Sequence, residues 1–264
     1  MKSLPFKSQT FAIDDSWKST FDTYDAPSIG RGSSGTVLAI NKILVIKVFA
    51  DDDEGQLDYD RETSIYSELQ SEHQSPYIVH FIEEWQSGLV LERLDCSLRI
   101  YLRQKSQHPV EKVLSWMHDA CKGLEFLHSK GIMHGDVGCH NFLVNRQQHL
   151  KLCDFAGSRR EGELARISYE VRGQHPTYQS GQPTRATELF ALVSFTPEYA
   201  LSLALNLFRV LLYLKCVLLY LLTQMRQTAL SKTNSDKTSF HSQTSIWISS
   251  GQLLSDAGGE DTSR

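Results

Sequence analysis

The pattern of apolar residues changes near position 94 of this 264-residue chain, and the change limits the folds that the chain can adopt. Before it lie three short apolar runs typical of β-strands, at 37–40, 43–49 and 88–94. One helix is predicted among them, at 59–70. After Asp95, apolar residues recur every three or four positions from 113 to 127, as in an amphipathic helix. We therefore expect an α+β fold in which a β-rich segment precedes a helical one.

Composition excludes several classes of protein. The chain carries 27 Lys and Arg residues against 31 Asp and Glu residues, a formal net charge of −4, so nucleic acid is not an expected partner. Its five cysteines are scattered and form no C-x-x-C pair. This argues against a disulfide framework or a zinc site and favours the cytoplasm or nucleus. The amino end lacks a long apolar stretch, and we expect no signal peptide.

Three segments differ from the centre of the chain. Residues 1–24 are polar and are expected to form an N-terminal arm. A leucine-dense block at 199–222 is long enough to span a membrane, but two basic residues near its centre make insertion the less favoured interpretation. Residues 231–264 are rich in Ser and Thr and are expected to be disordered.

A glycine-rich sequence with the pattern G-x-G-x-x-G-x-V contains Gly30, Gly32, Gly35 and Val37. Glycine lets the backbone approach a phosphate closely and direct N–H groups at it. A strand, not a helix, follows the last glycine, which argues against a dinucleotide-binding fingerprint. Thr36 and Val37 replace the Lys and Ser or Thr of a Walker A loop, so that loop is excluded. These residues alone leave a phosphate-binding hairpin and a plain glycine-rich hairpin both open.

Lys47 lies within an apolar, strand-like run. A buried ammonium group is costly unless an acidic side chain pairs with it. Glu62, in the predicted helix, is our candidate partner, and three other residues compete with it on sequence alone: Glu54, Asp60 and Glu68. The plainer alternative is a lysine on the open face of an edge strand.

The most specific pattern is His134-x-Asp136-x-x-x-x-Asn141, followed by Asp154-Phe155. A carboxylate at Asp136 can orient an acceptor hydroxyl group. The amide oxygen of Asn141 and the carboxylate of Asp154 are hard oxygen ligands, which Mg²⁺ prefers when it bridges phosphates. The two patterns therefore favour phosphoryl-transfer chemistry.

Taken in order, the glycine loop, the strand lysine, the helix glutamate and the two aspartate patterns resemble the eukaryotic protein-kinase family. The sequence at 134–157 is similar to a divergent group of such domains common in filamentous fungi. The resemblance covers 25–192 and implies a two-lobed fold, with a β-rich N-lobe at 25–94 and a helical, incomplete C-lobe at 95–192. The remaining tail, 193–264, does not resemble the family.

The resemblance implies an ATP- and Mg²⁺-dependent kinase of the Ser/Thr class that phosphorylates a protein substrate. It implies that Lys47 binds phosphates with Glu62 as its partner. Asp136 would then be the catalytic aspartate, and Asn141 and Asp154 the metal ligands. The family also implies a larger set of nucleotide-binding residues: Gly30, Gly32, Gly35, Val37, Lys47, Glu92 and Leu94.

Four positions depart from the family pattern. Gly135 stands where many kinases have the arginine that binds a phosphorylated activation loop, so activation by loop phosphorylation is not expected. Gly138 stands where Ser/Thr kinases have a lysine near the transferred phosphate. Ala156 replaces a glycine, and Glu188 replaces the usual aspartate of the central C-lobe helix.

Two other functions stay open. Small-molecule phosphotransferases of the aminoglycoside and choline type share the fold and the H-G-D sequence found here at 134–136. The glycine loop and the compact spacing of the motifs favour a protein kinase over them. The short C-lobe is also compatible with a non-catalytic pseudokinase that acts as an interaction module.

Overall fold

The computed structural model describes residues 13–70, 75–104, 108–166 and 169–194. All of them belong to the first of two units, Met1–Leu214. The second unit, Lys215–Arg264, lies outside the described residues, as do the expected leucine-dense block at 199–222 and the Ser/Thr-rich segment at 231–264. Within the described ranges, none of the helices has both the length and the apolar character needed to cross a membrane.

The first half of the described chain forms an antiparallel sheet with the strand order β1-β2-β3-β5-β4. Its strands are β1 (Ser28–Arg31), β2 (Thr36–Ala39), β3 (Leu44–Val48), β4 (Phe81–Trp85) and β5 (Gly88–Glu92). The three predicted runs correspond to β2, β3 and β5. Asn41 ends the first run, because its Oδ1 accepts hydrogen bonds from the N–H groups of Ile43 and Leu44 and closes the turn. The central strand is β3, which carries Lys47.

A short 3-10 helix, η1 (Asp15–Ser19), precedes the sheet and packs on one of its faces. Trp17 is buried in a cluster with Leu38, Ile46 and Val90 and makes edge-to-face contacts with two other aromatic rings, those of Phe21 and Trp85. Burial of an indole supplies a large apolar area. The described part of the expected N-terminal arm therefore contributes to the core beneath the sheet.

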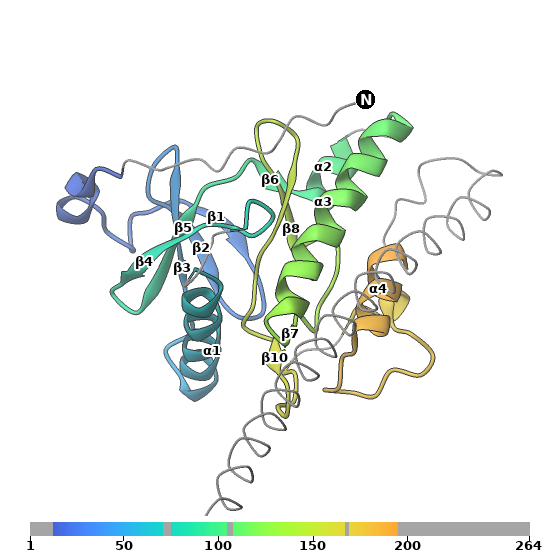
Figure 1. The fold of residues 1–264 in the computed structure, drawn as a ribbon. Coiled ribbons are helices and arrows are strands. Elements are labelled where there is room, and N and C mark those ends of the chain that lie inside the picture. Colours follow the sequence, from blue (N-terminus) through green and yellow to red (C-terminus); the bar gives the residue numbers. More distant parts are fainter. Residues whose placement is uncertain (1–12, 71–74, 105–107, 167–168, 195–264) are drawn as a thin grey trace, which may run out of the picture. The chain divides into compact units, whose positions relative to one another are not determined.

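Helix α1 (Asp53–Gln70) lies beside the sheet and contacts β4 (Figure 1). The helix begins at Asp53, whereas the sequence predicted a start near 59. Its first turns are polar and carry no apolar period, so the pattern of apolar residues did not reveal them. The carboxylate of Asp52 accepts a hydrogen bond from the Gly55 N–H at 2.8 Å, which satisfies one of the free donors of the helix start. The buried face of α1 carries Glu62 among apolar residues.

The second half is mainly helical. Its helices are α2 (Leu98–Gln104), α3 (Val110–Ser129), the 3-10 helix η2 (Val171–Gly173) and α4 (Arg185–Ser194). Its short strands are β6 (Cys96–Ser97), β7 (Ile132–Met133), β8 (Phe142–Val144), β9 (Leu150–Leu152) and β10 (Arg159–Arg160). Pro109 precedes α3, where its fixed φ suits a helix start, and Gly131 follows the helix with φ +72°, a conformation common at helix ends.

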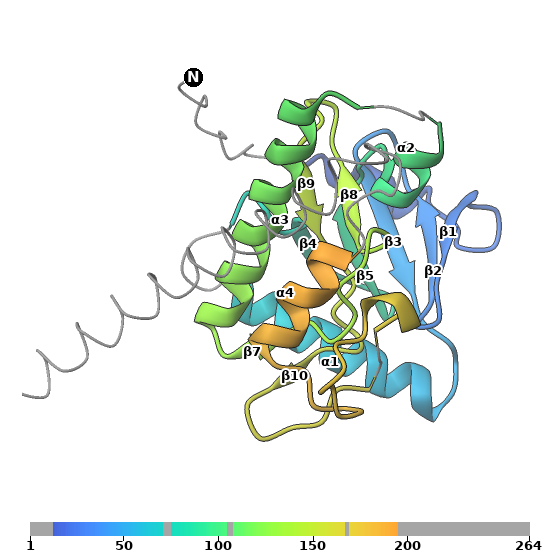
Figure 2. The same ribbon diagram turned by 90° about the vertical axis from the view of Figure 1, so that its right-hand side faces the viewer.

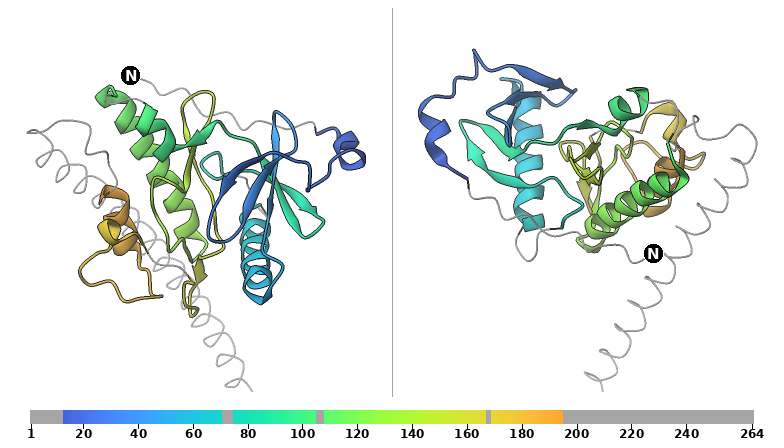
Figure 3. Two further views of the ribbon diagram at one scale, coloured as in Figure 1. Left: turned by 180° about the vertical axis from the view of Figure 1, so that it is seen from behind. Right: turned by 90° about the horizontal axis from the view of Figure 1, so that it is seen from above.

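The short strands lie between α3 and the five-stranded sheet (Figures 1 and 2). Strands β6, β8 and β9 form one small sheet, and β7 pairs with β10. Helix α3 packs against β9 and β7. The right-hand view of Figure 3 shows α1 with the large sheet on one side and α3 and α4 on the other. The expected α+β, two-lobed architecture is confirmed.

Helix α4 carries Glu188, which the resemblance assigns to the central helix of the C-lobe. The Thr184 N–H donates to Oγ1 of Thr187 at 2.8 Å, and the Thr187 N–H donates back to Oγ1 of Thr184 at 3.2 Å. This reciprocal cap fixes the first turn, which carries Glu188. The side chain of Glu188 is fully buried and accepts a hydrogen bond from the Gly135 N–H at 2.8 Å. Helix α4 therefore supports the loop that contains the H-x-D pattern.

Candidate active site

Lys47 lies between two carboxylates. Its Nζ is 2.6 Å from Oε2 of Glu62 on α1 and 2.7 Å from Oδ1 of Asp154, which follows β9. Lys47 and Glu62 are buried, whereas the Asp154 side chain is 32% exposed. The structure thus selects Glu62 among the acidic residues that competed for Lys47; Glu68, by contrast, pairs with Arg160.

The charges of this cluster depend on one another. Burial alone would lower the pKa of Lys47, but the carboxylates of Asp154 and Glu62 outweigh it and raise that pKa above its ordinary value. Burial raises the pKa of Glu62 to about 7, against the opposing effect of the Lys47 ammonium. Burial also acts to raise the pKa of Asp154, but the same ammonium prevails and lowers it. Asp154 is therefore the carboxylate of the pair that is held ionised.

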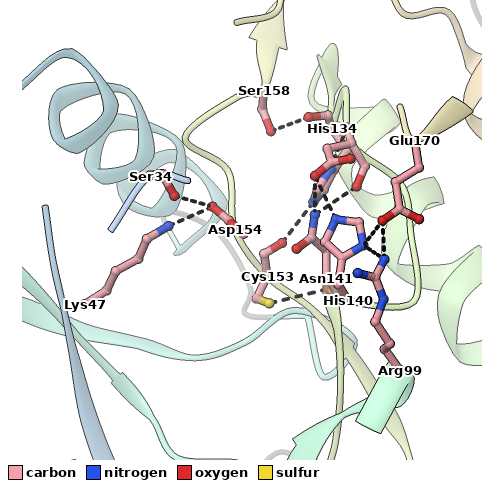
Figure 4. Close-up of polar contacts among 11 residues, drawn as sticks. Ser34, Lys47, Arg99, His134, His140, Asn141, Cys153, Asp154, Ser158 and Glu170 are labelled. Carbon is pink, nitrogen blue, oxygen red and sulfur yellow. Dashed lines mark hydrogen bonds and ion pairs between the residues drawn. The ribbon is translucent and has the colours of Figure 1, made fainter. Parts of the chain in front are cut away.

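The glycine loop between β1 and β2 lies over Asp154. Oγ of Ser34 donates to Oδ1 of Asp154 at 3.2 Å, as Figure 4 shows. A Cβ atom at Gly35 would come within 2.3 Å of the Val48 carbonyl oxygen, so packing alone requires that glycine. A Cβ at Gly32 would meet only Oδ2 of Asp154, at 4.0 Å. Gly32 is therefore free of a packing requirement and leaves its backbone open to close approach by a ligand.

The residues around Asp154 fix its position. Its backbone φ is +67°, in the left-handed region that non-glycine residues adopt at a cost and that is common at functional sites. The next residue, Phe155, is fully buried and makes edge-to-face contacts with Tyr66 of α1 and with His134. Nε2 of His134 lies 2.9 Å from the Cys153 carbonyl oxygen. The loop after β9 is thus anchored to both α1 and the H-x-D loop.

Asp136 and Asn141 also lie together. Nδ2 of Asn141 donates to the carbonyl oxygen of Asp136 at 2.9 Å and to its Oδ2 at 3.0 Å. Both side chains are buried. Since its amide nitrogen is committed to Asp136, Asn141 keeps its Oδ1 available as a ligand.

The donor set around Asn141 and Asp154 suits Mg²⁺ bound together with phosphates. Within the described ranges, no group of three or more His, Cys, Asp or Glu side chains is arranged to hold a metal ion by itself. Mg²⁺ usually keeps few protein ligands and takes the others from water and substrate phosphates. One amide oxygen and one partly exposed carboxylate match that preference.

The other residues of the expected nucleotide-binding set lie on or next to strands of the large sheet. Glu92 ends β5 with a buried side chain, which accepts hydrogen bonds from the His80 N–H at 2.7 Å and from the Lys151 ammonium. Leu94 lies two residues after Glu92 and is half-buried. Val37 of β2 pairs with Lys47 of β3 across the sheet, whereas Gly30 lies in β1.

Two further sets of polar contacts at this site were not predicted from the sequence. Nε2 of His140 lies 2.8 Å from Oδ2 of Asp136, and its ring lies between Asn141 and Arg99 in Figure 4. Arginines after Asp154 bind α1: Arg160 pairs with Glu68 at 3.0 Å, and Arg166 pairs with Asp58 at 3.1 Å. Asp136 and His140 are four residues apart but lie in a loop, where that spacing carries no signal, and Arg160 and Arg166 are 92 and 108 residues from their partners on α1.

The chain is similar to known protein kinases. A protein-family model described as "Protein kinase domain" matches residues 24–179. The chain is 28% identical to the Arabidopsis thaliana Serine/threonine-protein kinase RUNKEL over 186 residues, which cover 65% of this chain and 13% of that protein. It is 29% identical to Mitogen-activated protein kinase kinase kinase 2 of the same plant, over 53% of this chain and 24% of that protein. It is 27% identical to human Cyclin-dependent kinase-like 5, over 53% of this chain and 16% of that protein.

The chain spans less than a quarter of the length of each of these three relatives. They come from a plant and an animal, so the expected fungal character of the domain stays a prediction.

Proposed function

The chain belongs to the protein kinase domain family, and from that premise we propose that it transfers the γ-phosphate of ATP to a Ser or Thr hydroxyl of a protein. The observation that carries the proposal is the Lys47 cluster. A buried lysine is held between a helix glutamate and an aspartate that a serine of the glycine loop also contacts. That arrangement places a fixed positive charge beside an acidic group and an open stretch of backbone, which suits a bound polyphosphate.

Each residue has a role in this proposal. Lys47 binds phosphate oxygens, and Glu62 holds the ammonium in place. Asn141 and Asp154 would hold Mg²⁺, which supplies positive charge to the phosphates. The backbone from Gly30 to Gly35 covers the phosphates, Val37 packs near the nucleotide, and the backbone groups of Glu92 and Leu94 bind the adenine.

Asp136 acts on the acceptor. Its Oδ2 accepts two hydrogen bonds, from Asn141 and His140, while the described residues supply no hydrogen bond to its Oδ1. Oδ1 therefore orients the acceptor hydroxyl and receives its proton. As the hydroxyl oxygen forms its bond to the γ-phosphorus, the bond from that phosphorus to the β–γ bridging oxygen breaks and ADP leaves.

The partners in this proposal are ATP and a protein, without nucleic acid. The cysteines of the described residues are all free, which supports a reducing compartment, the cytoplasm or nucleus.

A transfer assay with radiolabelled ATP and Mg²⁺ tests the proposal. Generic protein substrates are compared with aminoglycosides and choline, and the Asp136→Asn variant serves as the control. We expect label on serine or threonine of the protein substrates with the wild type only. Label on the small molecules alone would instead support a small-molecule phosphotransferase, and no transfer to any acceptor would support a non-catalytic interaction module.

A further inference from the structure

The imidazole of His140 occupies space that any side chain at position 138 would need. A Cβ atom at Gly138 would lie 2.5 Å from Cε1 and 2.7 Å from Nδ1 of that ring. The backbone of Gly138 is not among those with positive φ, so its conformation does not require glycine. Gly138 and the ring position of His140 are therefore linked by packing: the ring fits because position 138 has no side chain.

The neighbours of His140 fix which ring nitrogen carries the proton. Nδ1 lies 2.8 Å from Nη2 of Arg99. A guanidinium group can only donate hydrogen bonds, so Nδ1 accepts and carries no proton. Nε2 then carries the proton and donates it toward Oδ2 of Asp136, at 2.8 Å. Arg99 is itself held by an ion pair with Glu170, and its backbone N–H donates to the Cys139 carbonyl oxygen at 2.9 Å.

This contact completes the restraint on the Asp136 carboxylate. The terminal torsion of an aspartate is broad, so one hydrogen bond leaves the carboxylate free to rock. Here Oδ2 accepts from two donors, Nε2 of His140 and Nδ2 of Asn141. Among the described residues Oδ1 has no hydrogen-bond donor, which leaves it available to an acceptor hydroxyl.

We propose that His140 is a positioning residue of the loop: in the space left by Gly138, it holds Oδ2 of Asp136 so that Oδ1 meets the acceptor hydroxyl. Ser/Thr kinases have a lysine where this chain has Gly138; here that position has no side chain, and His140 contacts the aspartate. The inference rests on the proposed function, since it assigns a role in phosphoryl transfer.

The first test compares two substitutions in the full chain, His140→Phe and His140→Ala. Phenylalanine keeps a ring in the space but has no N–H group. We expect both variants to lower kcat by about 10- to 100-fold, the size of effect that a misplaced catalytic group causes, with KM for ATP unchanged. The matched control is His118→Phe, since His118 lies on α3 with a side chain that is 59% exposed, and it should keep the wild-type rate.

A thermal melt of each variant checks that it is folded. If His140→Phe keeps the wild-type kcat, the histidine only fills space and the proposal is wrong.

The second test uses the packing link. In the presence of His140, Gly138→Lys should displace the ring and lower kcat by at least tenfold. In the His140→Ala background the lysine has room to reach Asp136, so Gly138→Lys should raise kcat above that of His140→Ala alone. An equal loss in both backgrounds would mean that the two positions are not coupled, which contradicts the proposal.

The third test does not depend on catalysis. Long-range ¹H–¹⁵N correlations of the imidazole rings should show His140 as the Nε2–H form, with a downfield proton that moves upfield in Asp136→Ala. The Nδ1–H form, or a resonance indifferent to Asp136→Ala, would overturn the proposal. If the wild type phosphorylates no substrate, the proposed function is contradicted. The NMR measurement then still tests the hydrogen bond between His140 and Asp136.

Discussion

Two glycines of the loop between β1 and β2 differ in what a methyl group would meet. At Gly35 it would collide with the backbone of Val48, whereas at Gly32 it would meet only the carboxylate of Asp154, at 4.0 Å. One glycine is therefore explained by the fold and the other by the ligand that we propose. The same four-residue loop carries both requirements.

We expect Gly35→Ala to lower the free energy of unfolding by about 1–3 kcal/mol, because the sheet must shift to admit the methyl group. Gly32→Ala should change stability by less than about 0.5 kcal/mol but raise KM for ATP about tenfold, the equivalent of about 1.4 kcal/mol. Denaturant unfolding and initial-rate kinetics on both variants measure the contrast. The reverse pattern would show that Gly32 is the packing residue.

In the proposed function, the H-x-D loop acts in the chemical step and not in nucleotide binding. Asp136 contacts His140 and Asn141 and has no polar contact with Lys47 among the described residues. Asp136→Asn should therefore lower kcat by about 100- to 10,000-fold while nucleotide affinity stays within a few-fold. Lys47→Met should lower both kcat and nucleotide affinity, because it removes the charge proposed to bind phosphate and leaves Glu62 buried without its partner. Steady-state kinetics with a nucleotide-binding titration test this, and equal activity of Asp136→Asn and wild type would refute the assignment of Asp136.

At the scale of elements, arginine side chains fasten helix α1 to the segment after Asp154. Nη1 of Arg61 donates to the carbonyl oxygens of Ser158, at 2.6 Å, and Leu164, at 3.1 Å. Arg160 and Arg166 add ion pairs with Glu68 and Asp58 on the same helix. Since α1 also carries Glu62, these contacts hold the Glu62 carboxylate where it can bind Lys47. These contacts involve none of the hydroxyl side chains of the segment, so we expect them to hold α1 whether or not a hydroxyl is phosphorylated, as the glycine at position 135 also predicts.

We expect phosphatase treatment to leave the transfer rate unchanged. The double substitution Arg160→Ala/Arg166→Ala should lower kcat several-fold, because α1 and Glu62 then lose two of their supports, each worth on the order of 0.2–1 kcal/mol at a partly exposed site. Arg103→Ala, at the exposed end of α2, is the matched control. A tenfold fall after phosphatase treatment, reversed by rephosphorylation, would reveal a phosphate-binding site that these contacts do not explain.

The helix α1 also illustrates what sequence could and could not predict. Its apolar second half was predicted, but its polar first turns depend on the Asp52 cap, which no apolar period reveals. Four acidic residues of this helix could have paired with Lys47, and only the packing of α1 against the sheet selects Glu62. Asp136, Asn141 and Asp154 could be proposed from sequence because a fixed spacing accompanies the chemistry expected of them. His140 was not, because its contact depends on the path of a loop.

At the scale of the whole described unit, the proposed ligand sites use residues from both halves of the fold. The sheet supplies Lys47 and the glycine loop, and the helical half supplies Asn141 and Asp154. Direct polar contacts between the halves include Lys47 with Asp154, Ser34 with Asp154, and Lys151 with Glu92. A ligand that bridges the halves therefore stabilises both at once, and its effect is measurable on unfolding of the unit as a whole.

Thermal unfolding with ATP, with and without Mg²⁺, measures this coupling. A ligand at 100 times its Kd adds about 2.7 kcal/mol to the folded state, which raises the Tm of a domain of this size by about 5–10 °C. We expect that rise with ATP and Mg²⁺ together and a smaller rise with ATP and EDTA. Asp154→Asn should lose the part that depends on Mg²⁺, because it removes one of the two proposed ligands, whereas Lys47→Met should lose most of both parts. The same rise with and without Mg²⁺ in the wild type would show that Asn141 and Asp154 do not hold a metal with the nucleotide, and the proposed role of these two residues would then be wrong even if ATP binds.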